Sequence, residues 1–265
     1  MLTRLLAALV GLAVLLPALV WGGEVAVEII VPVVAALCVL EYAGMAFPDD
    51  RVVASVFTLL GLGVVYVAAL YVPDAPVAWL AAVVLVATLI FVTLRPGASL
   101  ERAADKVGRY LVGMGWIGLL AFLPLLRRLE LGLAWVFMVL VISWLGDTGA
   151  YFAGRFFGKR KLYPRVSPKK TWAGAVGGVV AAVLGAFVVR AVGVPSLGVL
   201  ETALLAAVLC VFGILGDLGE SLLKRAFSVK DSGWIMPGHG GLLDRIDSLL
   251  FVAPLLYGYL VWVRG

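Results

Sequence analysis

The chain has 265 residues, of which 63% are hydrophobic and only 14% are charged, with a formal net charge of +5. Soluble domains carry about 25% charged residues, so a soluble fold of this length could not hide so much apolar surface from water. The composition therefore excludes an ordinary soluble protein, and lipid is the expected solvent for most of the surface.

Nine apolar stretches follow one another along the chain. Each approaches or exceeds the roughly 20 apolar residues that a bilayer-spanning helix needs. They are continuously apolar rather than alternating, which excludes a β-barrel. The first is interpreted as a mature helix and not a cleaved signal peptide, because no clear small-residue cleavage site follows it. We predict an all-α polytopic integral membrane protein with about nine transmembrane helices, at 5–22, 25–46, 52–72, 76–94, 108–126, 131–152, 172–193, 197–220 and 246–263.

The basic residues indicate how these helices are oriented. With the N-terminus in the cytoplasm, the loops after the second, fourth, sixth and eighth stretches face inward, including the two most basic loops, 153–171 and 221–245. The positive-inside rule favours this orientation. Such loops suit anionic headgroups or phosphates, and no nucleic-acid-binding motif is present. Of the 21 Lys and Arg residues, those left outside are Arg127, Arg128, Arg190 and Arg264.

The residues that can do chemistry are concentrated in the second half of the chain. Residues 1–140 are interpreted as generic membrane helices, and residues 141–265 as the catalytic part of a single membrane domain. Glu28 and Glu41 lie inside the second stretch but 13 residues apart, on different faces of a helix. Pairing or packing roles are therefore expected for both.

The first polar cluster runs from Asp147 to Thr171. A carboxylate at the depth of Asp147 costs roughly 2.5–3.5 kcal/mol on insertion scales, which favours a functional role. Residues 167–171, Ser-Pro-Lys-Lys-Thr, open the seventh stretch. A hydroxyl cap and lysines at a helix N-terminus make a phosphate site. The alternative is a basic anchor at the membrane surface combined with a helix cap.

The second cluster ends the eighth stretch. Asp217, Ser221 and Lys224 are spaced at i, i+4 and i+7, so they share one helix face. A carboxylate, a hydroxyl and an ammonium group in this order can bind a cation and then a phosphate. The alternative is a solvated helix end with an internal ion pair.

The third cluster extends from Lys230 to Asp247. Its glycine-rich turn, which contains His239, can present backbone N–H groups to phosphate oxygens. Asp244 and Asp247 share a face where the ninth stretch begins, and carboxylate oxygens favour Mg²⁺ over zinc. The alternatives are a histidine that only stabilises the turn and acidic residues that only complement the helix dipole.

Carboxylates beside lysines and arginines at a membrane surface favour phosphoryl or nucleotidyl transfer on a lipid. At Ser221–Asp247 the sequence reads S-x-x-K-R-x4-K-D-x-G-x3-P-G-H-G-G-x-x-D-R-x-D, which resembles the signature of the phosphatidate cytidylyltransferases, also called CDP-diacylglycerol synthases. The similarity extends to residues 216–218, 167–171 and 147–151. Ala173 departs from the pattern, because this family usually has Glu before the following glycine.

The resemblance implies that CTP and phosphatidate react to give CDP-diacylglycerol and pyrophosphate, with Mg²⁺ required. The compact length of 265 residues favours a bacterial inner membrane. The phosphate of phosphatidate would attack CTP directly, so no protein nucleophile is needed. The binding of a second metal or a monovalent cation is left open, and so is the formation of a homodimer. The residues expected to act are the metal ligands Asp217, Asp244, Asp247 and Asp231, the catalytic Ser221 and Lys224, and the substrate-binding Ser167, Lys170, Thr171, Arg225, Lys230, His239 and Arg245.

Three other classes of protein are alternatives. A CDP-alcohol phosphotransferase or a polyprenyl transferase would show Asp-rich motifs that the sequence lacks. A transporter would be favoured by inverted repeats and by polar residues at the membrane midplane, whereas here the polar residues gather at one side. A non-catalytic lipid-binding scaffold does not explain the set of aspartates.

Overall fold

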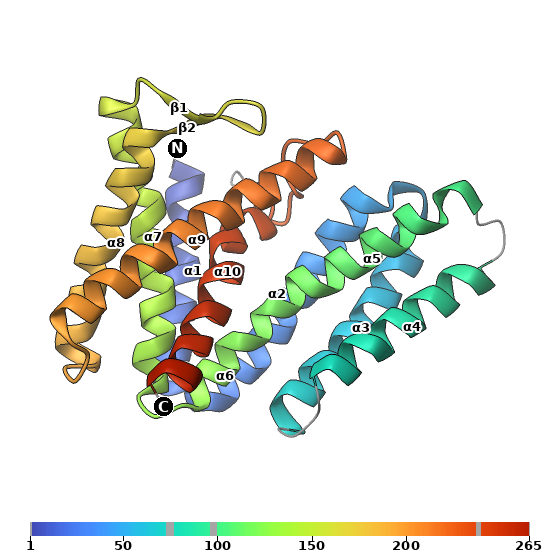
Figure 1. Ribbon diagram of the computed structural model, residues 1–265, viewed down its shortest axis with the longest axis horizontal. Helices are drawn as coiled ribbons and strands as arrows, with labels where there is room; N and C mark the ends of the chain where they lie inside the picture. The colour runs from blue at the N-terminus through green and yellow to red at the C-terminus, as the bar shows by residue number, and fades with distance from the viewer. Residues whose placement is uncertain (1, 73–76, 96–99, 237–239, 265) are drawn as a thin grey trace.

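The computed structural model describes residues 2–72, 77–95, 100–236 and 240–264, and nearly all of this is helical (Figure 1). Every predicted stretch coincides with a helix, and the fifth is divided between two helices joined by a short 3-10 turn, η3. The helices are α1 (Leu2–Trp21), α2 (Gly23–Ala46), α3 (Arg51–Tyr71), α4 (Val77–Leu94), α5 (Ala103–Gly118), η3 (Leu119–Ala121), α6 (Phe122–Arg128), α7 (Gly132–Phe157), α8 (Trp172–Gly193), α9 (Val199–Ala226) and α10 (Leu243–Tyr259), with short helical turns η1 (Pro48–Asp50), η2 (Leu100–Arg102) and η4 (Leu260–Arg264).

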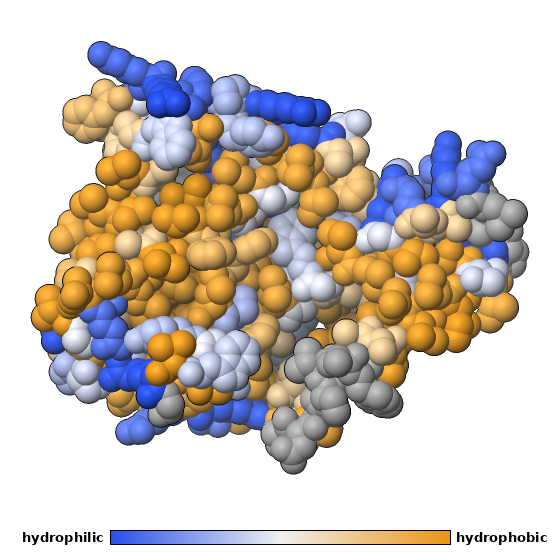
Figure 2. Space-filling model, viewed as in Figure 1, coloured by the Kyte–Doolittle hydropathy of each residue, from blue (hydrophilic) through white to orange (hydrophobic). Residues whose placement is uncertain are grey.

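The helices confirm a polytopic membrane protein. Within the described residues, 7 helical segments are long and apolar enough to cross a membrane, and the shorter segments Gly11–Trp21 and Leu80–Leu94 are also apolar. Figure 2 shows a broad hydrophobic surface with hydrophilic residues gathered toward its upper and lower edges. The number of nine transmembrane helices stays a prediction.

A short β-hairpin was not predicted. Strands β1 (Lys161–Tyr163) and β2 (Ser167–Thr171) pair antiparallel just before α8. Pro164 and Pro168 explain the difference, because the residue before a proline is biased toward an extended backbone. Thr171 then caps α8 by accepting a hydrogen bond from the backbone N–H of Gly174 at 3.1 Å. The expected helix cap is therefore present, but it follows a strand.

Glycines bring α7 and α8 into close contact. A Cβ atom at Gly177 would lie 2.2 Å from the Cβ of Ala153, and one at Gly149 would lie 2.6 Å from the carbonyl oxygen of Gly177. Contacts this short leave no room for a side chain. Gly149 of the first polar cluster and Gly177 of α8 therefore allow the two helices to approach each other closely.

We expect a Gly177→Ala substitution to lower the free energy of unfolding by about 1–3 kcal/mol, because the added methyl group would push the two helices apart. The unfolding midpoint in detergent measures this loss. Gly108→Ala is the matched control, since no atom lies within 4 Å of its added Cβ and alanine is the better helix former. Equal midpoints for the two variants would contradict the packing argument.

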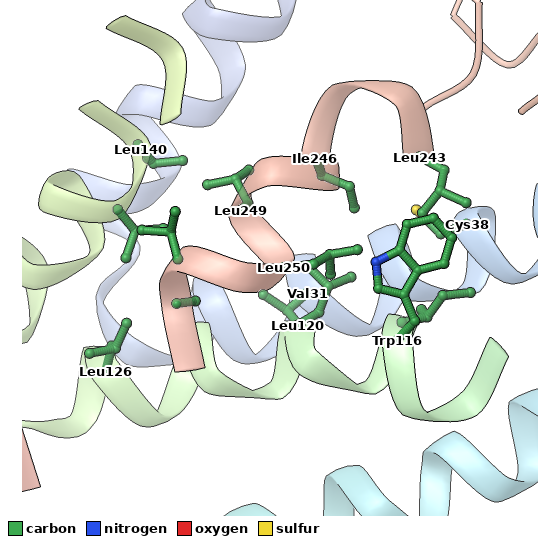
Figure 3. Close-up of a cluster of buried hydrophobic side chains, with 14 of the residues drawn as sticks. Val31, Cys38, Trp116, Leu120, Leu126, Leu140, Leu243, Ile246, Leu249 and Leu250 are labelled. Carbon is green, nitrogen blue, oxygen red and sulfur yellow. The ribbon is translucent and has the colours of Figure 1, made fainter. Parts of the chain in front are cut away.

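The buried core surrounds α10. Figure 3 shows side chains of α10, including Leu243 and Leu250, between Val31 of α2, Trp116 of α5 and Leu126 of α6. Leu243, Leu250 and Leu126 are each at most 1% exposed. The start of α10, where two of the predicted metal ligands lie, is therefore held in place by helices from the N-terminal half of the chain.

Candidate active site

A pocket of about 550 Å³ brings the three polar clusters together. It lies among α7, the hairpin, α8, α9 and α10, at the end of these helices where β1 and β2 lie in Figure 1. Six acidic and five basic side chains line its wall. The charged residues of the lining are Asp147, Arg155, Lys169, Lys170, Asp217, Glu220, Lys224, Asp231, Asp244, Arg245 and Asp247.

The first and second clusters meet through Lys170 and Asp217. Lys170 Nζ lies 2.5 Å from Asp217 Oδ2, and Ser221 Oγ donates a long hydrogen bond of 3.5 Å to Asp217 Oδ1. Lys170 comes from β2, whereas Asp217 and Ser221 come from α9. The hairpin therefore places an ammonium group against the carboxylate of Asp217.

The second and third clusters meet through Lys224. Its ammonium group forms an ion pair with Asp244 Oδ1 and lies 3.4 Å from Glu220 Oε2. All three side chains are largely buried, with Glu220 only 1% exposed. Buried charges of this kind need compensation from one another, so the three groups act as one electrostatic unit.

Asp244 also shapes the loop before α10. Its Oδ2 accepts hydrogen bonds from the backbone N–H groups of Ser232 at 3.0 Å and Gly241 at 2.9 Å. Both of its carboxylate oxygens are thus engaged, one with Lys224 and the other with the loop. Asp244 therefore has a structural role in addition to the metal-binding role that its position in the signature suggests.

Glu41 reaches this loop from α2. Its Oε1 accepts a hydrogen bond from the N–H of Leu242 at 3.0 Å, and its Oε2 accepts from the N–H of Leu243 at 2.9 Å and from Ser232 Oγ at 3.3 Å. The N–H groups at a helix N-terminus lack partners within the helix and favour a negative charge. The pairing role expected for Glu41 is confirmed, but its partner, the loop of the catalytic signature, was not foreseen.

Glu28 also has the pairing role predicted for it, but its partners lie away from the loop that Glu41 contacts. Its Oε1 lies 2.5 Å from the guanidinium of Arg128, and Tyr71 donates to its Oε2 at 3.1 Å. These contacts join α2 to α6 and α3. Glu28 is therefore part of the packing of the N-terminal helices and does not line the pocket.

The structure brings most of the predicted site residues together. Arg225 and Lys230, however, are exposed, and Arg225 donates to the carbonyl oxygen of Val229 at 3.2 Å. Ser167 lies opposite Tyr163 in the hairpin. His239 lies outside the described residues. The predicted residues that line the pocket are Lys170, Thr171, Asp217, Lys224, Asp231, Asp244, Arg245 and Asp247.

Glu220 is the principal site residue that the sequence analysis missed. It lines the pocket, and both carboxylate oxygens are buried without a hydrogen-bond partner. Its spacing could have identified it, because it follows Asp217 by three residues and precedes Lys224 by four, on the same helix face. Asp147, Arg155 and Lys169 also line the pocket. Asp147 and Lys169 belong to the first polar cluster, but none of the three was among the predicted site residues.

The chemistry of the pocket fits a magnesium ion, but its ligands are not pre-assembled. Within the described residues, no group of three or more Asp, Glu, His or Cys side chains is arranged to hold a metal. Asp217 and Asp244 contact Lys170 and Lys224 instead. The buried carboxylate oxygens of Glu220 accept no hydrogen bond from the described part of the chain, and their one ion-pair partner there is Lys224 at 3.4 Å, which leaves Glu220 able to bind a cation. Carboxylates are the ligands that Mg²⁺ prefers.

Ala173, the departure from the family pattern, lies outside this pocket. It lines a separate apolar groove on α7 and α8, together with Phe156 and Trp172.

Membrane helices that enclose lysine-paired carboxylates define a polytopic membrane protein suited to chemistry on phosphate groups. The sequence model described as "Cytidylyltransferase family" matches residues 2–263. The chain belongs to the cytidylyltransferase family.

Curated relatives include proteins named phosphatidate cytidylyltransferase. The Bacillus subtilis protein is 45% identical over 155 residues, which cover 58% of this chain and 58% of the relative. The Pseudomonas aeruginosa protein is 44% identical over 156 residues, covering 56% of this chain and 57% of the relative. The aligned part of the chain thus spans little more than half the length of these relatives.

Proposed function

We propose that this protein transfers the cytidylyl group of CTP to phosphatidate and forms CDP-diacylglycerol and pyrophosphate, as a step of phospholipid biosynthesis. The observation that carries the proposal is the pocket in which Lys170 and Lys224 pair with carboxylates at one end of the membrane helices. Membership of the cytidylyltransferase family and the name shared by the relatives support the choice of substrates.

In the proposed reaction, a phosphate oxygen of phosphatidate attacks the α-phosphorus of CTP. The new P–O bond forms as the bond between the α-phosphorus and the bridging oxygen breaks, and pyrophosphate leaves with that electron pair. Because both reactants are anionic, charge neutralisation and positioning are the main tasks of the protein. Arg155, Lys169 and Lys170 line the side of the pocket formed by α7 and the hairpin and would bind phosphate groups there.

Asp217, Glu220 and Asp247 would hold Mg²⁺, with Asp231 and Asp244 as the further predicted ligands. When bound, the metal would neutralise charge on the triphosphate. Lys224 holds the carboxylates of Glu220 and Asp244 together. Ser221 orients Asp217 through its hydroxyl group.

We infer that the N-terminus and the pocket face the cytoplasm of a bacterial inner membrane. The uneven distribution of Lys and Arg between the two sides supports this orientation, and the relatives are bacterial. CTP is then available on the side where the pocket opens. A homodimer stays a prediction.

Pyrophosphate release by the detergent-purified protein tests the proposed function. We expect release only when CTP, phosphatidate and Mg²⁺ are all present, and we expect EDTA to abolish it. Asp217→Asn should reduce the rate by about a hundredfold or more, because the pocket loses a carboxylate that would hold the charge-neutralising Mg²⁺. Asp217 is a better choice than Asp244, because replacing Asp244 would also break its hydrogen bonds to the loop. A folding defect would then be difficult to separate from a catalytic one.

Two outcomes would contradict this function. Release without phosphatidate would indicate simple CTP hydrolysis, and no release from well-folded protein would favour another lipid phosphotransferase. CDP-diacylglycerol with an alcohol would then be the substrate pair to examine. An unfolding midpoint equal to that of the wild type is the control that the Asp217→Asn protein is folded.

A further inference from the structure

An apolar groove of about 740 Å³ lies directly beside the polar pocket. It runs between α8 and α9, and residues of the hairpin, including the buried Val166, form part of its wall. The groove and the pocket share Leu162, Ala175 and Ile214. An apolar space therefore begins where the phosphate-binding surface ends.

This continuity matches the chemistry of a phospholipid. A molecule whose phosphate lies against Lys169 and Lys170 must direct its acyl chains away from the charged wall, and the shared apolar residues provide such a direction. The volume also falls within the roughly 300–1,000 Å³ of small-molecule sites. A surface that only contacts ordinary bilayer lipid does not require residues of the hairpin in its wall, and it does not require a connection to a polar pocket.

Small side chains keep the groove open near the junction. A Cβ at Gly219 would meet only the ring of Phe251, at 4.0 Å, and Ala175 stands at the boundary between groove and pocket. Farther along, Val211 and Leu215 are 46% and 49% exposed. The groove is thus open sideways, so that a lipid could enter it without leaving the membrane.

We propose that this groove between α8 and α9 binds an acyl chain of the phosphatidate substrate while its phosphate occupies the polar pocket. The inference rests on the proposed function and adds to it the part of the protein that recognises the lipid chain. Val211 precedes Asp217 by six residues, about 9 Å along the helix at 1.5 Å per residue. Bulk at Val211 should therefore obstruct the far end of a long chain and spare a short one.

Val211→Trp tests this expectation, with Val188→Trp as the control. Val188 is also lipid-exposed, at 65%, and lies on α8 outside the groove. We expect Val211→Trp to reduce kcat/KM at least about tenfold for dioleoyl phosphatidate and less than about twofold for dihexanoyl phosphatidate, since apolar contacts of a few methylenes have effects of this size. Val188→Trp should leave both values within about twofold. An unchanged chain-length dependence in Val211→Trp would overturn the proposal.

Photo-crosslinking tests the same groove without requiring turnover. Phosphatidate with a diazirine near the end of one acyl chain is irradiated with the wild-type protein in the absence of CTP. We expect labelling within residues 175–180 or 211–222, displaced by unlabelled phosphatidate but not by phosphatidylcholine. Equal displacement by both lipids, or labelling elsewhere, would mean that ordinary lipid fills the groove and would overturn the proposal. Selective labelling without pyrophosphate release would instead contradict the proposed reaction and leave the lipid site standing.

Discussion

Replacing Lys224 with methionine is expected to reduce the rate of pyrophosphate release by at least about a hundredfold. The ammonium group of Lys224 compensates the carboxylates of Asp244 and Glu220, both of which line the pocket. Without it, two buried negative charges repel each other and the anionic substrates. The rate should be measured at saturating CTP and phosphatidate, together with the unfolding midpoint, because breaking a buried pair also costs about 3–5 kcal/mol of stability.

The adjacent residue provides a matched control. Arg225 is exposed, and its guanidinium donates to the carbonyl oxygen of Val229 just beyond the end of α9. We expect Arg225→Ala to change the rate less than about threefold, since exposed polar contacts contribute little. If the two variants lost activity equally, the basic run itself would bind substrate, as the sequence signature suggested, and the distinction drawn from the structure would be wrong.

Glu41→Ala is expected to have the largest effect on stability. It removes the acceptor for Leu242 N–H, Leu243 N–H and Ser232 Oγ in a site where Glu41 is only 5% exposed. Each buried donor left without a partner costs about 1–3 kcal/mol, so the three donors together predict a loss of about 3–9 kcal/mol. The unfolding midpoint in detergent measures it, and activity should fall as well because the loop that carries Asp244 is loosened.

Two further variants separate this role from a general loss of charge. Glu41→Gln keeps one side-chain oxygen as an acceptor and should recover part of the stability. Glu28→Ala removes a carboxylate from the same helix, but from a partly exposed ion pair with Arg128, and should cost about 1 kcal/mol or less. A loss as large for Glu28→Ala as for Glu41→Ala would contradict a specific role of Glu41 at the start of α10.

Much of the fold could be predicted because a membrane imposes one simple requirement. A helix long enough to cross the bilayer leaves a continuous apolar stretch, and this pattern located each helix. The hairpin at residues 161–171 has no such pattern, since it is short and polar. The break between α5 and α6 was missed for the opposite reason, because apolar residues continue through Leu119–Ala121 where the helix tightens into a 3-10 turn.

The candidate site was predictable in position but not in its pairings. Charge asymmetry and the signature placed the polar clusters on one side of the membrane, and the structure gathers them in one pocket. No periodicity reveals which lysine meets which carboxylate, because Lys170 and Asp217 are brought together only by the packing of separate elements. For the same reason, no local sequence pattern reveals the contact of Glu41 with a loop about 200 residues later in the chain.

The contact of Glu41 with Leu242 and Leu243 also has a consequence for biosynthesis. A ribosome delivers α2 to the bilayer long before it delivers α10. The carboxylate of Glu41 is therefore without the N–H groups of Leu242 and Leu243 during most of translation. Contacts between residues so far apart in sequence form late, after the large entropy of closing the intervening chain has been overcome. Maturation of the catalytic loop should therefore be among the last events of folding, and a fragment that begins after α2 would contain the whole signature yet lack the group that completes it.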